Sequence, residues 1–293
     1  GSAKSTIALI GGGTRIAWLS RAASTGTSRA MTSPPPLIFD RIARRLRRDR
    51  LARHGGSPLE QEMAEELGQR LGAVKRSFAT ALVINSGGGH MTSVLRGRGI
   101  VVTESDHGEV YATAPSGLFC DEDRLDVSPQ RFDLVVMPSG LDTIDDVPGA
   151  LIAARRALAD GGLFLACLVG SPSLPVLRHV VSTIDASEGR AVARLHPQID
   201  VRAAGDLLVR AGFVLPVADA ETLRLSYASF DRLVQDVRAA GLGNVLAERR
   251  SLPRGWLDAA RATFDAAKGD DGRVTETVTM LVLTGWAPDA KAS

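Results

Sequence analysis

The sequence predicts an α/β protein with a doubly wound, mostly parallel sheet, and three observations support that prediction. An apolar run at 81–84 meets three consecutive glycines and then resumes with helical spacing. Further apolar runs alternate with helical patterns at the spacing of strand–helix–strand units. Acidic residues follow two of these runs, at the edge of the sheet where doubly wound folds bind ligands. We therefore expect one large domain with its site at the carboxyl ends of the strands.

The glycine-rich turn is the stretch around which the other elements are arranged. Residues 81–95 read ALVINSGGGHMTSVL, which is typical of a buried strand, a tight loop and a helix. Gly87, Gly88 and Gly89 allow positive φ and close approach of a ligand, while free N–H groups of the following helix face the same space. Such a turn favours a nucleotide or a nucleoside-containing cofactor, but a plain strand-to-helix connection has the same pattern.

The bulk composition is that of a globular protein. The 293 residues are 44% hydrophobic and 23% charged, and the formal net charge is only +2, so overall charge directs the chain neither to nucleic acid nor to a membrane. The aromatic content of 4% argues against a base-stacking surface. Cys120 and Cys167 lie beside or inside apolar stretches, and we interpret them as small core residues. No apolar run reaches membrane-spanning length.

The first 36 residues differ from the rest, because they are rich in Ser, Thr, Gly and Ala and lack acidic residues. One interpretation is that the Gly1-Ser2 start is a cloning scar and Met31 the natural start, which suits a bacterial cytoplasmic protein. The other is that an acid-free leader with arginines is an organellar transit peptide, which suits the mitochondrial matrix. We prefer the first. In both cases we expect the fold to occupy residues 37–293.

Two helices are expected ahead of the glycine turn. Residues 37–53 combine spaced apolar residues with a run of arginines, and predict an amphipathic, strongly basic helix. Its arginines can form a solvated face on a helix that docks onto the domain, or they can contact an anionic partner such as a phosphopantetheine carrier, an acidic protein surface or RNA. Ser57, Pro58 and Glu60 form a helix-start signal, which predicts a helix to about Val74.

After the turn, apolar runs predict further strands at 99–104, 118–120, 131–137 and 163–169, with a helix from Val147 to Leu158. The strand ends should bring Asn85, Glu104, Asp121 and Pro138 together. Beyond residue 170 we expect helices at 174–184, 201–211, 229–240 and 257–267, extended segments at 213–217 and 222–227, and a β-rich ending at 274–286. Helical segments at about 172–200 and 228–270 are expected to form a lid over the strand ends.

With these elements in order, the chain resembles the class I S-adenosylmethionine-dependent methyltransferases. Within them it resembles the branch of the malonyl-carrier O-methyltransferase of biotin synthesis and of the respiratory complex I assembly factor described as an arginine hydroxylase. The resemblance covers about 37–288 and rests on Ile38-Phe39-Asp40-Arg41, on the segments 130–136, 146–151 and 155–165, on Leu208 with Ala211-Gly212-Phe213, and on the ending Leu283 to Pro288. It implies a seven-stranded, Rossmann-like sheet and S-adenosylmethionine as cofactor.

The resemblance also implies a set of cofactor-binding residues. The loop residues Asn85, Ser86, Gly87 and Gly89 would hold the methionine part, and Glu104, which ends the second strand, would accept the ribose hydroxyls. The adenine would lie near the acids after the third strand, Asp121 and Glu122. The first motif departs from the family pattern, because Val83 stands where an acid is usual and Asn85 where a glycine is usual. Cofactor binding should therefore be weakened or lost.

The functional prediction follows from the same resemblance. We expect a methyltransferase-like protein acting on a protein or carrier-bound substrate; the alternative is a catalytically degenerate assembly or binding factor of the complex I type. Its partner would then be a respiratory-chain subunit, with Arg44 and Arg48 as a docking surface. His90, His107 and Asp142 are candidate bases, although loop residues of these types are more often solvated. No metal site is expected, and nothing in the sequence favours a nucleic-acid partner.

Overall fold

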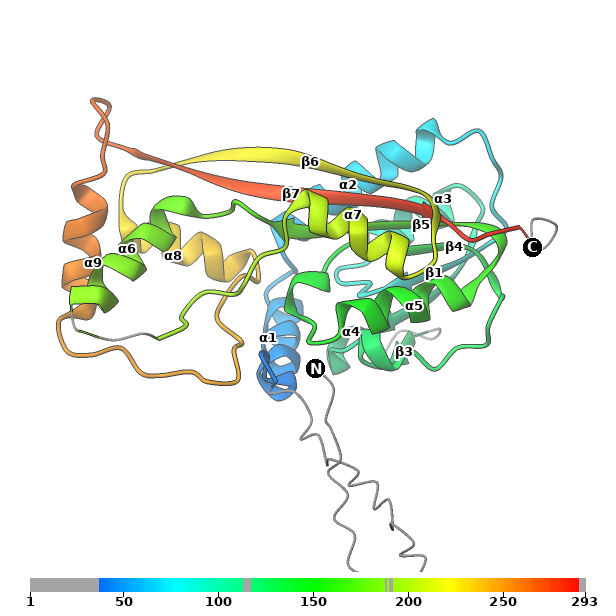
Figure 1. The fold of residues 1–293 in the computed structure, drawn as a ribbon, viewed down its shortest axis with the longest axis horizontal. Coiled ribbons are helices and arrows are strands. Elements are labelled where there is room, and N and C mark those ends of the chain that lie inside the picture. Colours follow the sequence, from blue (N-terminus) through cyan, green and yellow to red (C-terminus); the bar gives the residue numbers. More distant parts are fainter. Residues whose placement is uncertain (1–36, 113–116, 188, 190–191, 290–293) are drawn as a thin grey trace, which may run out of the picture. The chain divides into compact units, whose positions relative to one another are not determined.

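The computed structural model describes residues 37–112, 117–187, 189 and 192–289. Seven strands form one sheet in the order β3-β2-β1-β4-β5-β7-β6 (Figure 1). The strands are β1 (Thr80–Ile84), β2 (Val101–Asp106), β3 (Gly117–Phe119), β4 (Phe132–Met137), β5 (Leu158–Gly170), β6 (Val214–Tyr227) and β7 (Val274–Trp286). Only β7 runs against its neighbours β5 and β6. The predicted doubly wound, mostly parallel, seven-stranded sheet is confirmed.

Helices cover both faces of the sheet, because its central strands are apolar on both sides. The helices are α1 (Arg41–Arg53), α2 (Pro58–Ala73), α3 (His90–Gly97), α4 (Glu109–Ala112), α5 (Val147–Ala157), α6 (Pro175–Ser187), α7 (Val201–Arg210), α8 (Phe230–Ala239) and α9 (Trp256–Asp265), with short 3-10 turns η1 (Glu122–Arg124) and η2 (Leu141–Thr143). The predicted start signal of α2 is confirmed, since the Ser57 hydroxyl accepts from the Glu60 N–H.

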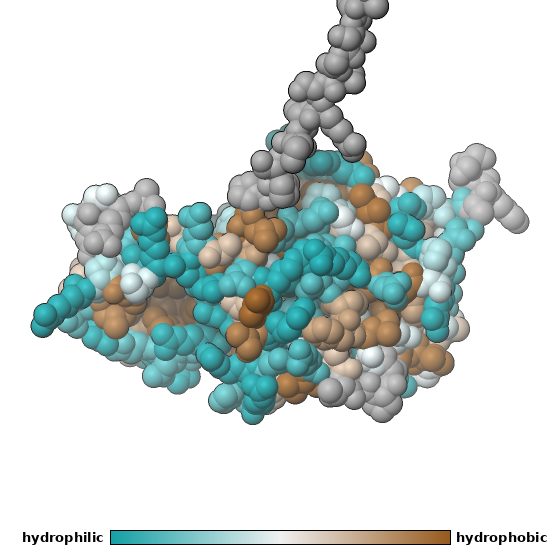
Figure 2. Space-filling model, turned by 90° about the horizontal axis from the view of Figure 1, so that it is seen from below, coloured by the Kyte–Doolittle hydropathy of each residue, from teal (hydrophilic) through white to brown (hydrophobic). Residues whose placement is uncertain are grey.

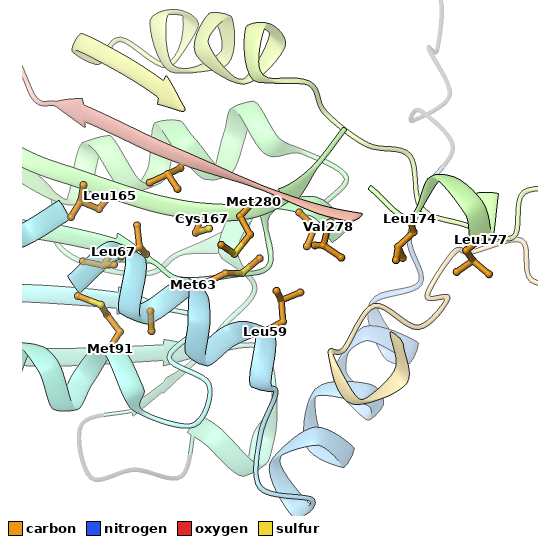
Figure 3. Packing of buried hydrophobic residues seen from close by; sticks show 14 of the residues in the cluster. Leu59, Met63, Leu67, Met91, Leu165, Cys167, Leu174, Leu177, Val278 and Met280 are labelled. Atoms are coloured by element: carbon orange, nitrogen blue, oxygen red, sulfur yellow. The ribbon is translucent and has the colours of Figure 1, made fainter. Parts of the chain in front are cut away.

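Two apolar clusters form the core, one on each face of the sheet. Alternate residues of β1 show the division: Ala81 and Val83 pack with α2 and α3, whereas Leu82 and Ile84 pack with α5 and α7. Figure 3 shows the first cluster, in which Leu59, Met63 and Leu67 of α2 face Met280 and Cys167 of the sheet. Cys167 is buried as expected, Cys120 is partly buried, and both are free thiols.

The second half of the chain extends the sheet and adds the helices beyond it. The two predicted extended segments at 213–217 and 222–227 are one strand, β6, which pairs along β7. β7 enters between β5 and β6, and the distal ends of β6 and β7 reach α6, α8 and α9 (Figure 1). One boundary was wrong: β5 begins at Leu158, which pairs with Phe132, and not at Leu163 as expected. The register shifts before Leu163, and Gly161 in this stretch adopts a φ of 64°, which a helix does not accommodate.

Helix α1 buries arginines and exposes apolar side chains, the reverse of what is expected of a docked amphipathic helix. Ile42 and Leu46 are 69% and 61% exposed, whereas Arg44 and Arg48 are each only 5% exposed. Figure 2 shows apolar side chains in brown among teal polar ones on this lower face of the molecule. The expectation that the arginines form one solvated face was therefore wrong for Arg44 and Arg48, and so was their use as a docking surface. Their burial needs compensating negative charge.

None of the helices in the described part of the chain is long and apolar enough to cross a membrane. No group of three or more His, Cys, Asp or Glu side chains within the same residues is arranged to hold a metal ion.

Candidate functional site

The glycine turn joins β1 to α3 at the carboxyl edge of the sheet, where the site was expected. Asn85, Gly87 and Gly89 adopt φ values of 58°, 57° and 76°, the left-handed region that glycine and asparagine tolerate best. Ser86 is buried, and its N–H donates to the carbonyl of Ser105 on β2 at 3.2 Å. The turn is thus a tight backbone cradle, and its concave side faces α1 and α2.

Arg48 of α1 fills the space in front of that cradle and pairs with Asp106, the last residue of β2. Its Nη2 lies 2.8 Å from Oδ2 and its Nε 3.0 Å from Oδ1, a bidentate contact. Asp106 also accepts from the backbone N–H of Gly87 at 3.1 Å and of Gly108 at 2.8 Å. Burial raises the pKa of Asp106, but the charge of Arg48 outweighs it, so that the pKa is lowered.

Glu60 of α2 closes the same space from the other side. It forms an ion pair with the second terminal nitrogen of Arg48 and accepts from the Ser139 hydroxyl at 2.9 Å. A Cβ atom placed on Gly87 would lie 3.0 Å from Glu60 Oε2 and 3.2 Å from Arg48 Nη2. The two side chains therefore lie directly against the glycine turn, in the position where a bound cofactor would contact it.

A second buried ion pair lies beside the first. Arg44 holds Glu122 of η1 through contacts of 2.8 and 3.2 Å, and Glu122 is 1% exposed. The Nδ1 atom of His107 lies 3.2 Å from the same carboxylate. Burial raises the pKa of Glu122, but the nearby charges of His107 and Arg44 outweigh it, and the pKa falls well below its usual range. Glu122 therefore stays ionised.

Asn85 ties these groups together and explains why a side chain is tolerated where a glycine is usual. Its amide nitrogen donates to Glu122 and, at 3.0 Å, to the carbonyl of Ser139, while its oxygen lies 2.8 Å from His107 Nδ1. A Cβ atom on Gly140 would lie 2.0 Å from that amide nitrogen, so Asn85 packs directly against the backbone there. The Asn85 side chain therefore fills the space that a glycine at position 85 would leave empty.

The structure brings together only part of the predicted set. Asn85, Ser86, Gly87, Gly89 and Glu122 lie at the same edge of the sheet.

Glu104 contacts α3 and not the glycine turn: its carboxylate accepts from the Thr92 hydroxyl at 2.8 Å and from Arg96 at 2.9 Å. Asp121 pairs with Arg41 at 2.9 Å, on the outer side of Glu122. Their assignment to the cofactor stays a prediction.

The candidate bases have different surroundings. His107 is buried within the Asn85–Glu122 network, and His90 begins α3 with its ring beside Gly88.

Asp142, in η2, lines two small cavities. One, of about 70 Å³, lies between α1, the end of β5 and the segment 240–245, and the other, of about 30 Å³, lies between the end of β5 and the segment 195–198. Burial raises the pKa of Asp142 to about 6, and the charge of Arg44 only partly opposes this. His107 lines the larger of these cavities too, whereas Asp142 lines both of them.

The sequence does not predict three residues of the candidate site: Asp106, Glu60 and Ser139. Asp106 lies two residues beyond Glu104 and so on the same face of the strand, which means that alternation does not distinguish them. The distinction depends on β2 continuing to Asp106, and strand ends are the least certain part of a pattern. Glu60 was noted only as a helix-start residue, and nothing in its spacing indicates a partner on α1.

The comparisons with known proteins agree with the resemblance. The chain is 27% identical over 286 residues to human arginine-hydroxylase NDUFAF5, mitochondrial, covering 91% of the chain and 82% of that protein. It is 30% identical over 176 residues to malonyl-[acyl-carrier protein] O-methyltransferase of Xylella fastidiosa, covering 59% of the chain and 58% of that protein. No model of a protein family matches the chain.

Among solved structures, YcgJ from Bacillus subtilis superposes with a TM-score of 0.53 at 13% identity, covering 78% of this chain and 99% of that one. The chain has the class I methyltransferase fold. Its homologues include both NDUFAF5 and the malonyl-carrier methyltransferase. Within this methyltransferase fold, the carboxyl edge of the strands carries two buried arginine–carboxylate pairs in front of the glycine turn.

Proposed function

We propose that this chain is a partner-binding factor built on a class I methyltransferase fold, which recognises a protein or a carrier-bound group without turning over S-adenosylmethionine. The observation that carries the proposal is the pair of buried contacts from α1 to the carboxyl edge of the sheet, Arg48 to Asp106 and Arg44 to Glu122. The homologous NDUFAF5 and malonyl-carrier methyltransferase support a protein or carrier-bound partner.

The residues at the site do not fit S-adenosylmethionine as they are arranged. The cavity in front of the strand ends has a volume of about 70 Å³, whereas pockets for molecules of cofactor size are about 300–1,000 Å³. The carboxylates that would accept hydroxyl or ammonium groups already bind guanidinium groups, and Arg48 covers the cradle at Gly87. Val83, buried on β1, supplies no acid for an amino group.

A second candidate function is methyl transfer to a protein or carrier-bound substrate. Two observations favour it: the homology to a malonyl-carrier methyltransferase, and the position of Asp142. A carboxyl group with a pKa of about 6 that faces a cavity suits a general base near neutral pH. For this function α1 would have to withdraw both arginines, because they occupy the acids that the cofactor would need.

Calorimetric titration with S-adenosylmethionine and S-adenosylhomocysteine separates the two candidates. The proposed function predicts no saturable heat at millimolar cofactor. Micromolar binding that is lost in Asp106→Asn would contradict it and establish the second candidate. Asp206→Asn is the matched control, because it is the same substitution at an exposed acid of α7. Circular dichroism of each variant confirms that a lost signal does not reflect unfolding.

The finer identity of the partner and its compartment are also part of this proposal. Similarity to NDUFAF5 over 82% of the human protein supports a respiratory complex I subunit as partner. We propose a bacterial cytoplasmic location, with the mitochondrial matrix as the alternative that the similarity to mitochondrial NDUFAF5 supports. Immunoprecipitation of the full chain from its native cells, followed by mass spectrometry, tests both statements. Recovery without any respiratory subunit would contradict the complex I assignment.

A further inference from the structure

A recess between α1 and the end of α8 is lined by cationic side chains. We call it the α1–α8 recess; its volume is about 320 Å³ and its lining residues are Arg47, Arg50, Leu51, His54, Arg238, Ala239, Gly241 and Gly243. None of these residues is acidic. The recess adjoins the smaller cavity of the candidate site, because Arg47, Leu51 and Gly241 line both.

Helix ends explain some of these charges but not all of them. Arg50 lies in the last turn of α1 and Arg238 in the last turn of α8, where cations complement the helix dipole. Arg47 is farther from the helix end and is partly buried. In the described part of the chain its guanidinium contacts no carboxylate, and the backbone of Gly243 packs against it.

The surroundings of Arg47 disfavour its own charge. Burial lowers the pKa of Arg47, and the positive charges of Arg249, Arg50 and Arg238 lower it further. A buried cation without a counter-charge costs free energy, which is why most such groups are paired. The adjacent Arg44 and Arg48 on the same helix both have carboxylate partners. Arg47 differs from both, because no carboxylate of the described residues offsets its charge. A negatively charged group of another molecule would supply that counter-charge.

An apolar row lies next to the recess on the outer face of α1. Ile38 just precedes the helix, and Ile42 and Leu46 follow at four-residue intervals that align them along one side. They are 47%, 69% and 61% exposed. Arg50 continues the same row by one further turn, so exposed apolar side chains lead directly into the cationic recess.

We propose that the outer face of α1 and the α1–α8 recess form a docking site for an acidic segment of a partner protein, with a carboxylate entering the recess to Arg47 and apolar side chains covering Ile42 and Leu46. A recessed guanidinium favours a protruding side chain over a flat anionic bilayer, which would reach only the exposed rim. The proposal deepens the proposed function by naming the chemistry of the partner and the surface that it uses.

Selection of random peptides displayed on phage against the immobilised full chain tests the docking site. We expect the enriched peptides to combine Asp or Glu with Leu, Ile or Phe. Affinity of a synthesised winner should fall about tenfold or more in Arg47→Glu/Arg50→Glu, because like charges replace complementary ones. It should fall severalfold in Ile42→Ser/Leu46→Ser. Arg53→Glu, a single charge reversal on the same helix but outside the recess, is the control for each of the single variants Arg47→Glu and Arg50→Glu and should keep its affinity within about twofold.

Three results would overturn the inference. One is a selection without acidic enrichment, and another is peptide binding that is unchanged in Arg47→Glu/Arg50→Glu. The third is no peptide enrichment together with binding to phosphatidylcholine vesicles containing phosphatidylglycerol that the same variant loses, which assigns the face to a lipid surface. The readout involves no cofactor. Cofactor binding by calorimetry with acidic peptide binding intact would therefore refute the proposed function and leave the docking site standing.

Discussion

The inner and outer faces of helix α1 carry the same residue type in opposite electrostatic situations. On the inner face, Arg44 and Arg48 are buried and each holds a buried carboxylate of the sheet edge. On the outer face, Arg47 has no carboxylate partner among the described residues and lies among other arginines. The comparison teaches that an arginine run on one helix can serve two purposes, closing a site with one face and presenting charge with the other.

The inner face gives the largest expected effect. Arg48→Ala leaves Asp106 buried and without its counter-charge, and breaking a buried pair in this way costs about 3–5 kcal/mol. The free energy of unfolding, from urea denaturation, should fall by that amount. Arg53→Ala on the same helix should change it by less than about 0.5 kcal/mol, because Arg53 is exposed. Equal losses in both variants would mean that the two faces do not differ.

Asp142, beside the inner face of α1, gives the next largest effect, with the opposite sign. Because burial raises the pKa of Asp142 from 3.8 to about 6, the folded state binds the proton more tightly than the unfolded state. The stability that this proton gives is fully present below pH 3.8 and is lost as the pH rises through 6.

Asp142→Asn removes that loss. At pH 7 the variant should be more stable than the parent by up to about 3 kcal/mol. This free energy corresponds to a pKa of about 6 in the folded state against 3.8 in the unfolded state. At pH 3.5 the two should be equal. Urea denaturation at both pH values measures this, with the exposed Asp206→Asn as control. A variant that is less stable at pH 7 would show that Asp142 has a favourable partner after all.

The sequence predicts the scaffold well because the scaffold depends on periodic apolar patterns. Strands β1 and β4 and helices α2, α6 and α8 all lie near their expected ranges, and the place of the site follows from the sheet topology. The site itself was less predictable. Which of two acids on one strand faces the turn, and which arginines of α1 face inward, depend on contacts between segments far apart in the chain, such as Arg48 with Asp106.

The outer face gives the smallest effect on stability. Arg47→Gln removes a partly buried cation that faces three other arginines, so the free energy of unfolding should rise by a few tenths to about 1 kcal/mol at low salt. The gain should shrink in high salt, which screens the repulsion in the parent protein. Arg47→Lys keeps the charge and should show no gain. A loss of more than about 1 kcal/mol in Arg47→Gln, measured by urea denaturation, would mean that Arg47 is paired like Arg48. The difference between the two faces would then be one of burial and not of charge, and the docking site would lose its electrostatic basis.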